Sequence, residues 1–75
     1  MNKHVREQKL GRAVAQNRLM LGLTQREFAL RAGVGLRFLR DLEQGKPTIR
    51  LDKLMDVLTF LGCHLEIVPR TRSDP

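Results

Sequence analysis

The stretch from residue 24 to residue 33 carries signals for both ends of one short helix. Thr24 and Glu27 form a T-x-x-E capping box, in which each side chain satisfies a backbone N–H group at the start of a helix. Gly33 suits the left-handed backbone conformation that ends a helix. The sequence therefore predicts a short helix over residues 25–32, and a further helical pattern begins almost at once after it.

Apolar periodicity predicts three more helices around this short one. The first covers about residues 5–21, although Gly11 inside it costs about 1 kcal/mol relative to alanine. The third follows Gly35 and is ended by Gly45 and Pro47, and the fourth ends at Gly62. The residues that carry the spacing are Leu10, Ala13, Val14, Asn17 and Leu21 in the first helix, Leu39 and Leu42 in the third, and Leu51, Leu54, Met55, Leu58 and Leu61 in the fourth.

The period changes after Gly62. Residues 64–68 alternate polar with apolar side chains, which is typical of a β-strand, and Pro69 closes the run. A single strand leaves its backbone groups unpaired, so we expect it to pair with the same strand of a second copy, with Leu65 and Ile67 in the interface. The alternative is an extended tail packed on its own helices. We therefore divide the chain into a helical domain (1–62), a dimerisation strand (63–69) and a disordered tail (70–75).

The charge of the chain favours a polyanionic partner. Its 75 residues carry 14 Lys and Arg against 8 Asp and Glu, which gives a formal net charge of +6. Neutralising nucleic-acid phosphates releases counterions and so supplies affinity, although many small basic proteins bind nothing acidic. A domain of this length is usually stabilised by a disulfide, a metal or a partner subunit. Because Cys63 is the single cysteine, we expect a second copy of the chain to take that role.

Residues for catalysis, metal binding and membrane insertion are missing from the pattern. No serine or cysteine is placed for pairing with His4 or His64, and the carboxylates are scattered, so we expect no enzyme activity, no cofactor and no metal. No stretch approaches the roughly 18 apolar residues of a membrane span, and no signal peptide follows Met1. We expect a cytoplasmic protein in which Cys63 is a reduced, small buried hydrophobic residue.

Two short helices joined through Gly33-Val34-Gly35 match the helix-turn-helix arrangement, whose second helix enters the DNA major groove. Leu39 and Leu42 point that helix toward the core, which leaves its other face for base edges. The residues predicted to contact bases are Gly35, Leu36, Arg37, Arg40 and Asp41. Arginine pairs with guanine, leucine can touch a thymine methyl, and Asp41 would accept from cytosine or hold an arginine. The alternative for Arg37 and Arg40 is an ordinary solvated face.

A second group of residues is predicted to contact phosphates without reading sequence. Gln25 lies in the first turn of a helix, where free N–H groups favour an anion. Basic side chains after the third helix would hold the flanking backbone. The full set is Thr24, Gln25, Gln44, Lys46 and Arg50.

Several motifs together resemble the phage-repressor class of helix-turn-helix proteins, the Xre/Cro family. They are Leu21-Gly22-Leu23-Thr24-Gln25, Gly33-Val34, Leu42-Glu43-Gln44-Gly45 and Leu61-Gly62. The resemblance implies an all-α, lambda-repressor-like domain of four to five helices, which a short C-terminal strand would join to a second copy. It also implies an ion pair between Arg18 and Glu43 and a phosphate contact for Gln25. The base contacts that it implies are at Gly35, Leu36, Arg37 and Arg40.

Residues 34–40, the run Gly45-Lys46-Pro47-Thr48 and the trailing strand resemble HipB-type antitoxins. The resemblance implies a homodimer that binds double-stranded DNA at a palindromic operator and represses its own operon, with a HipA-like kinase toxin as its partner. A stand-alone Xre-type regulator or a restriction–modification controller protein would share the same fold and groove contacts. The alternative from another class is a protein-interaction module that binds no DNA.

Overall fold

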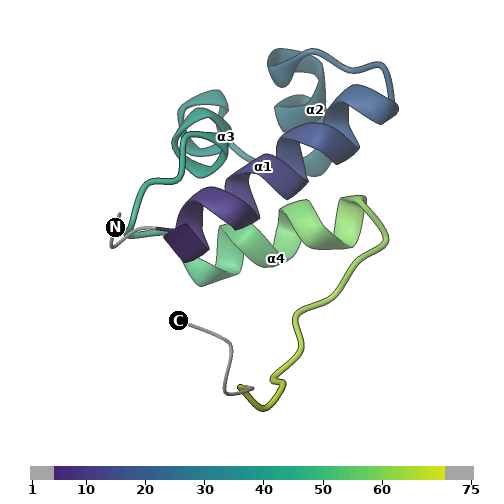
Figure 1. The fold of residues 1–75 in the computed structure, drawn as a ribbon. Helices are drawn as coiled ribbons and strands as arrows, with labels where there is room; N and C mark the ends of the chain where they lie inside the picture. The colour runs from purple at the N-terminus through teal and green to yellow at the C-terminus, as the bar shows by residue number, and fades with distance from the viewer. Residues whose placement is uncertain (1–4, 71–75) are drawn as a thin grey trace.

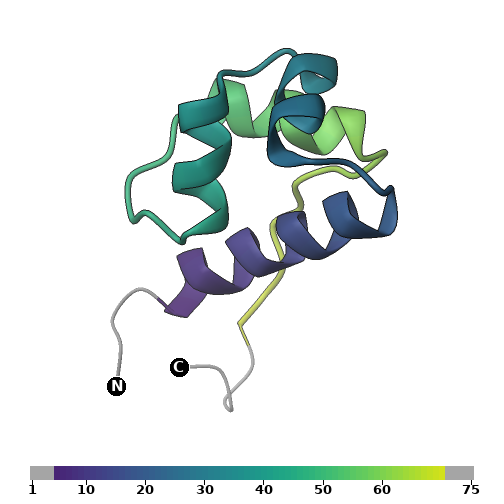
Figure 2. The ribbon, with the colours of Figure 1, turned by 90° about the horizontal axis from the view of Figure 1, so that it is seen from above.

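A computed structural model of the chain describes residues 5–70, and this part of the chain contains four helices. They are α1 (Val5–Met20), α2 (Gln25–Ala32), α3 (Leu36–Glu43) and α4 (Leu51–Phe60). α2 and α3 pack against each other, α1 packs against α3, and α4 packs against α2 (Figures 1 and 2). The all-helical architecture expected from the sequence is present in these residues.

The start and the end of α2 follow from the chemistry of its sequence. The Thr24 hydroxyl accepts a hydrogen bond from the Glu27 N–H at 3.1 Å, and Glu27 Oε1 accepts one from the Thr24 N–H at 2.9 Å. At the other end, Gly33 adopts a φ of 79° and donates its N–H to the Ala29 carbonyl. A residue with a Cβ is disfavoured in that conformation. The prediction of a helix over residues 25–32 is confirmed.

One apolar core holds the four helices together. It contains Val14, Leu23, Phe28, Ala29, Val34, Leu39, Leu42, Leu54, Val57 and Leu58. Phe28 and Phe60 meet edge to face, with ring centroids 5.1 Å apart and planes at 89°. This geometry is favoured by the aromatic quadrupole, and it fixes α4 against α2.

The predicted apolar stripe of α1 is largely wrong. Val14 is buried and Leu10 is partly buried, but Ala13, Asn17 and Leu21 are exposed. The amide of Asn17 donates to the Ala13 carbonyl of its own helix at 2.8 Å. α1 packs on α3 through Gly11 and Arg18, so it needs only a narrow apolar stripe.

The stripe of α4 is also partly wrong. Leu54 and Leu58 are buried and Leu61 is packed against the core, as the spacing predicts, but Leu51 is 63% exposed and Met55 is 39% exposed. Val57, which the spacing omitted, is fully buried. The buried face of α4 therefore includes Val57, and α4 packs against α2.

The chain after α4 is extended and lies below the helices in Figure 1. Residues 63–70 form no strand in this single copy. Leu65 is 46% exposed and Ile67 is fully exposed, so these residues do not pack as a tail on the helices. Cys63 is exposed, which corrects the prediction of a buried thiol, because the chain leaves the core after Leu61. Of the tail predicted as disordered, residues 71–75 lie outside the described part of the chain.

Candidate nucleic-acid interface

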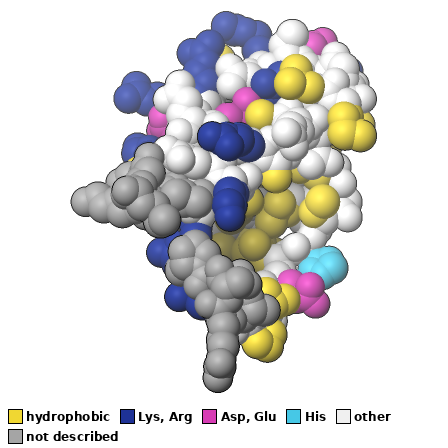
Figure 3. Space-filling model, viewed as in Figure 1, with side chains coloured by type: hydrophobic (Ala, Val, Ile, Leu, Met, Phe, Trp, Pro, Cys, Tyr) yellow, Lys and Arg dark blue, Asp and Glu magenta, His cyan; other side chains and the backbone are white. Residues whose placement is uncertain are grey.

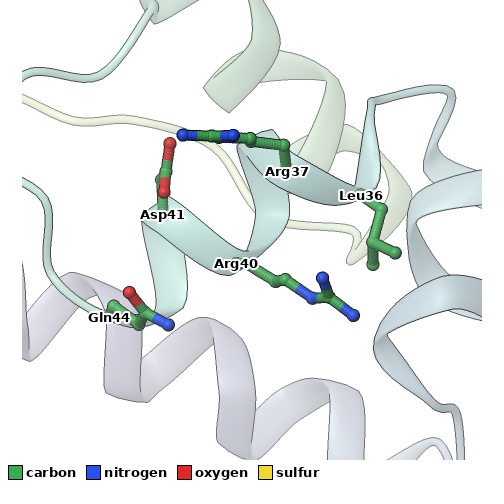
Figure 4. Close-up of a pocket in the computed structure, with 5 residues that line it drawn as sticks. All are labelled: Leu36, Arg37, Arg40, Asp41 and Gln44. Atoms are coloured by element: carbon green, nitrogen blue, oxygen red, sulfur yellow. The ribbon is translucent and has the colours of Figure 1, made fainter.

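The outer surface of α3 carries a shallow hollow that is open to solvent. Its lining residues are Leu36, Arg37, Arg40, Asp41 and Gln44 (Figure 4). Four of them were predicted to contact bases and one to contact phosphate. They share one face because Leu39 and Leu42 occupy the opposite face and are buried. The five residues therefore face solvent together because α3 buries Leu39 and Leu42 on its core side.

The two arginines of this surface are exposed. In the described part of the chain, neither Arg37 nor Arg40 takes part in an ion pair. Figure 4 shows the two guanidinium groups at different ends of the hollow, with Arg37 on the side of Asp41 and Arg40 toward α2. Both groups are thus available to a ligand that lies along α3.

Asp41 holds the loop that follows α3. The ammonium group of Lys46 lies 3.3 Å from Asp41 Oδ2, and the Lys46 N–H donates to the Asp41 carbonyl at 3.0 Å. From the sequence, Asp41 is predicted to accept from cytosine or to hold an arginine, and Lys46 is predicted separately to contact a phosphate. The structure pairs these two residues with each other. Their five-residue spacing across a helix end is the signal that would have joined them.

Glu43, the last residue of α3, joins three helices. It accepts two hydrogen bonds from Arg18 of α1, from Nε at 2.8 Å and from Nη2 at 3.0 Å, and one from the Gln25 amide of α2 at 3.0 Å. Arg18 also donates to the Leu23 carbonyl at 2.8 Å. The Arg18–Glu43 pair implied by the family resemblance is thus present, and the bond from Gln25 was not foreseen.

This cluster is shielded from water. The exposed fraction of the side chain is 12% for Arg18 and 7% for Glu43. The hydrogen bonds to Glu43 raise the pKa of the Arg18 guanidinium, although burial acts in the opposite direction. Arg18 is therefore a charged structural residue, and Gln25 is fixed at the start of α2 beside the C-terminal end of α3.

Two further residues predicted to contact phosphates, Thr24 and Arg50, lie outside α3, at the start of α2 and of α4. Thr24 is exposed and its hydroxyl oxygen serves the capping box. Arg50 precedes α4, where its Nη2 lies 2.7 Å from Asp52 Oδ2. The hydrogen bond from Arg50 lowers the pKa of the Asp52 carboxyl group. Leu65 and Ile67 do not line the hollow and belong to the extended segment after α4, which lies below the helices in Figure 1.

Positive charge gathers on this side of the molecule. In Figure 3, the Lys and Arg side chains concentrate over α3 and the neighbouring half of α1. Residues 5–70 contain no group of three His, Cys, Asp or Glu side chains that could hold a metal ion. Within the same range, no helix combines the length and apolar character needed to cross a membrane. The candidate site is thus a basic helical surface.

Two comparisons with known proteins relate to this geometry. Residues 14–68 match the sequence pattern of the family described as "Helix-turn-helix". The chain is also similar to y4mF of Sinorhizobium fredii, described as an uncharacterised HTH-type transcriptional regulator, with 54% identity over 46 residues. That match covers 61% of this chain and 60% of the relative.

Proposed function

The chain belongs to the helix-turn-helix family, and we propose that it binds operator DNA as a homodimer and represses transcription from its own promoter. The observation that carries the proposal is the outer face of α3, where Arg37 and Arg40 are exposed around an open hollow. A bidentate pair between arginine and guanine discriminates by about 1–3 kcal/mol against other bases. Two such side chains on one helix suit a major groove.

The base-reading residues are Gly35, Leu36, Arg37, Arg40 and Asp41, as the sequence analysis predicts. Gly35 and Leu36 start α3 with little polar chemistry, so the two arginines supply most of the hydrogen-bond readout. Asp41 accepts from a cytosine amino group once Lys46 turns to a phosphate. This exchange is supported by their exposed 3.3 Å ion pair, because such pairs hold their partners weakly.

The phosphate-binding residues are Thr24, Gln25, Gln44, Lys46 and Arg50. They lie before, at the end of and after α3 along the chain, so they fix the register of the helix in the groove without reading sequence. The position of Gln25 is supported by its hydrogen bond to Glu43, which holds the amide beside α3.

The dimer forms through the segment after α4. Leu65 and Ile67 are exposed two residues apart, and the backbone around them has no strand partner within residues 5–70. Pairing this segment with its copy across a two-fold axis would bury both side chains and satisfy the backbone. Two α3 helices would then read half-sites about 34–36 Å apart.

The finer biological role is that of a HipB-like antitoxin whose partner is a HipA-like kinase toxin. The resemblance of residues 34–40 and 45–48 to HipB-type antitoxins supports it. A stand-alone regulator is the second candidate, and it is supported by the description of the relative as an HTH-type transcriptional regulator. Co-purification with the product of an adjacent kinase gene distinguishes the two roles.

The DNA-binding proposal is tested by gel shifts on the gene's own promoter fragment, at two salt concentrations and with competitor DNA. Tight binding that survives competitor is expected. Arg37→Ala and Arg40→Ala should each relax specificity at one base-pair position per half-site. Weak binding that competitor removes would overturn sequence-specific repression and favour a protein-interaction module.

The dimer is tested by sedimentation of Ile67→Lys, with His64→Lys as the matched control. Residue 64 has the opposite parity in the alternating segment, so it adds the same charge on the other face. We expect Ile67→Lys to sediment as a monomer and His64→Lys as a dimer. A stable dimer of Ile67→Lys would contradict the proposed interface.

A further inference from the structure

α1 approaches α3 at the level of the backbone. A Cβ at Gly11 would overlap the backbone carbonyl oxygens of Leu42 and Glu43. Seven residues later on the same face of α1, Arg18 binds Glu43. These two positions define the side of α1 that touches α3, and they place the first half of α1 across the C-terminal end of α3.

The helical geometry of α1 then decides where Arg12 lies. Successive residues are rotated by about 100° around a helix, so Val14 lies about 60° to one side of Gly11 and Arg12 about 100° to the other. Val14 is 2% exposed and faces the core. Arg12 is exposed, so it lies on the opposite, solvent-facing edge of the contact between α1 and α3.

The same edge of α3 carries the candidate DNA surface. Because the core holds Leu39 and Leu42, the solvent-facing edge of α3 is the one with Arg40 and Gln44. Figure 4 shows Gln44 on the side of α3 that faces α1. Arg12 of α1 therefore adjoins the end of the hollow that Gln44 lines.

The charge at this edge is uncompensated within the described residues. Lys9 and Arg12 are both exposed, and neither takes part in any of the ion pairs of residues 5–70. The carboxylate of α1 belongs to Glu7, and one of its oxygens is buried. In Figure 3, Lys and Arg side chains lie over the part of the molecule that contains α3 and the neighbouring half of α1.

We propose that Arg12 binds a DNA phosphate beside the C-terminal end of α3. α1 would then add a contact to the DNA backbone, next to the phosphate contacts proposed for α2 and for the loop after α3. The inference rests on the proposed function, because it requires α3 to lie in the major groove. A guanidinium group suits this position, since it offers several donors in a planar fork that matches a phosphate. The contact carries no sequence information and adds affinity in proportion to released counterions.

The test is the salt dependence of DNA binding by the full chain carrying Arg12→Ala. Each phosphate contact contributes about 0.9 to the slope of log affinity against log salt, so two copies in a dimer should lower the slope by about 1.8. The loss of affinity should be equal on operator and on unrelated DNA. Arg12→Lys should restore the slope because it keeps the charge, and circular dichroism checks that each variant is folded.

Arg31→Ala is the matched control. Arg31 is exposed in the last turn of α2, and its charge acts on Glu27 of the same helix. We expect this variant to keep the slope of the unaltered protein. A slope for Arg12→Ala equal to that of Arg31→Ala, while Arg37→Ala still relaxes specificity, overturns the role of Arg12 and leaves the proposed function standing. Failure of the unaltered protein to bind DNA overturns both.

Discussion

Removal of the Glu43 carboxylate leaves the nearly buried guanidinium group of Arg18 without its counter-ion, with only the Leu23 carbonyl still accepting from it. This carboxylate accepts three hydrogen bonds, two from Arg18 and one from Gln25, with both members of the ion pair nearly buried. Breaking a buried ion pair from one side costs about 3–5 kcal/mol. The whole chain is expected to have a stability of only about 4–11 kcal/mol at its length. We therefore expect Glu43→Met to lose a large part of its free energy of unfolding.

The assay is urea unfolding followed by circular dichroism, performed on Glu43→Met, Arg18→Met and the double variant. Each single variant should lose about 3–5 kcal/mol. The double variant should lose less than either single variant, because it leaves no buried charge and its two methionines can pack together. Losses below about 1 kcal/mol that simply add in the double variant would refute this reasoning, because they are typical of a pair screened by water.

Two further substitutions probe the contacts that shape α1 and α2. Gly11→Ala should gain about 1 kcal/mol of helix propensity. It should still lose about 1–3 kcal/mol of stability net, because its Cβ would overlap the Leu42 carbonyl. Gly35→Ala is the control, since its Cβ meets nothing within 4 Å, and equal urea midpoints for the two variants would contradict the close approach of α1 to α3. Glu27→Gln tests the capping box, because hydrogen bonds with Thr24 lower the pKa of the Glu27 carboxyl group in the folded protein. The stability that the ionised Glu27 adds is therefore present above the unfolded pKa of about 4.5, and it is lost as the pH falls through the lower folded pKa. The variant should therefore lose less stability than the unaltered protein on acidification, and equal losses would count against the cap.

The region around α2 could be predicted because its signals are local. Thr24, Glu27 and Gly33 act on backbone groups within a few residues, so the helix bounds follow from sequence alone. The outward face of α3 could be predicted for a related reason. Leu39 and Leu42 fix the rotation of a short helix, and Arg37 and Arg40 follow from it.

The face of α1 could not be predicted because it depends on a contact distant in sequence. Leu21 and Asn17 fit an apolar or neutral stripe by spacing, yet they are exposed. Arg18 lies outside the predicted stripe, yet its side chain is 12% exposed and joins α1 to α3. No residue near Arg18 in the sequence points to this pair, since Glu43 lies 25 residues away, and only the family resemblance implied it.

Gly11 connects these observations. With any side chain there, α1 would be pushed away from the carbonyl groups that end α3. Arg18 would then move away from Glu43, and Glu43 would keep only the hydrogen bond from Gln25. The same displacement would carry Arg12 away from the outer edge of α3. The glycine that reads as a weakness in a helix is thus the residue that sets both the buried ion pair and the position of the basic edge, so a substitution there should weaken folding and DNA affinity together.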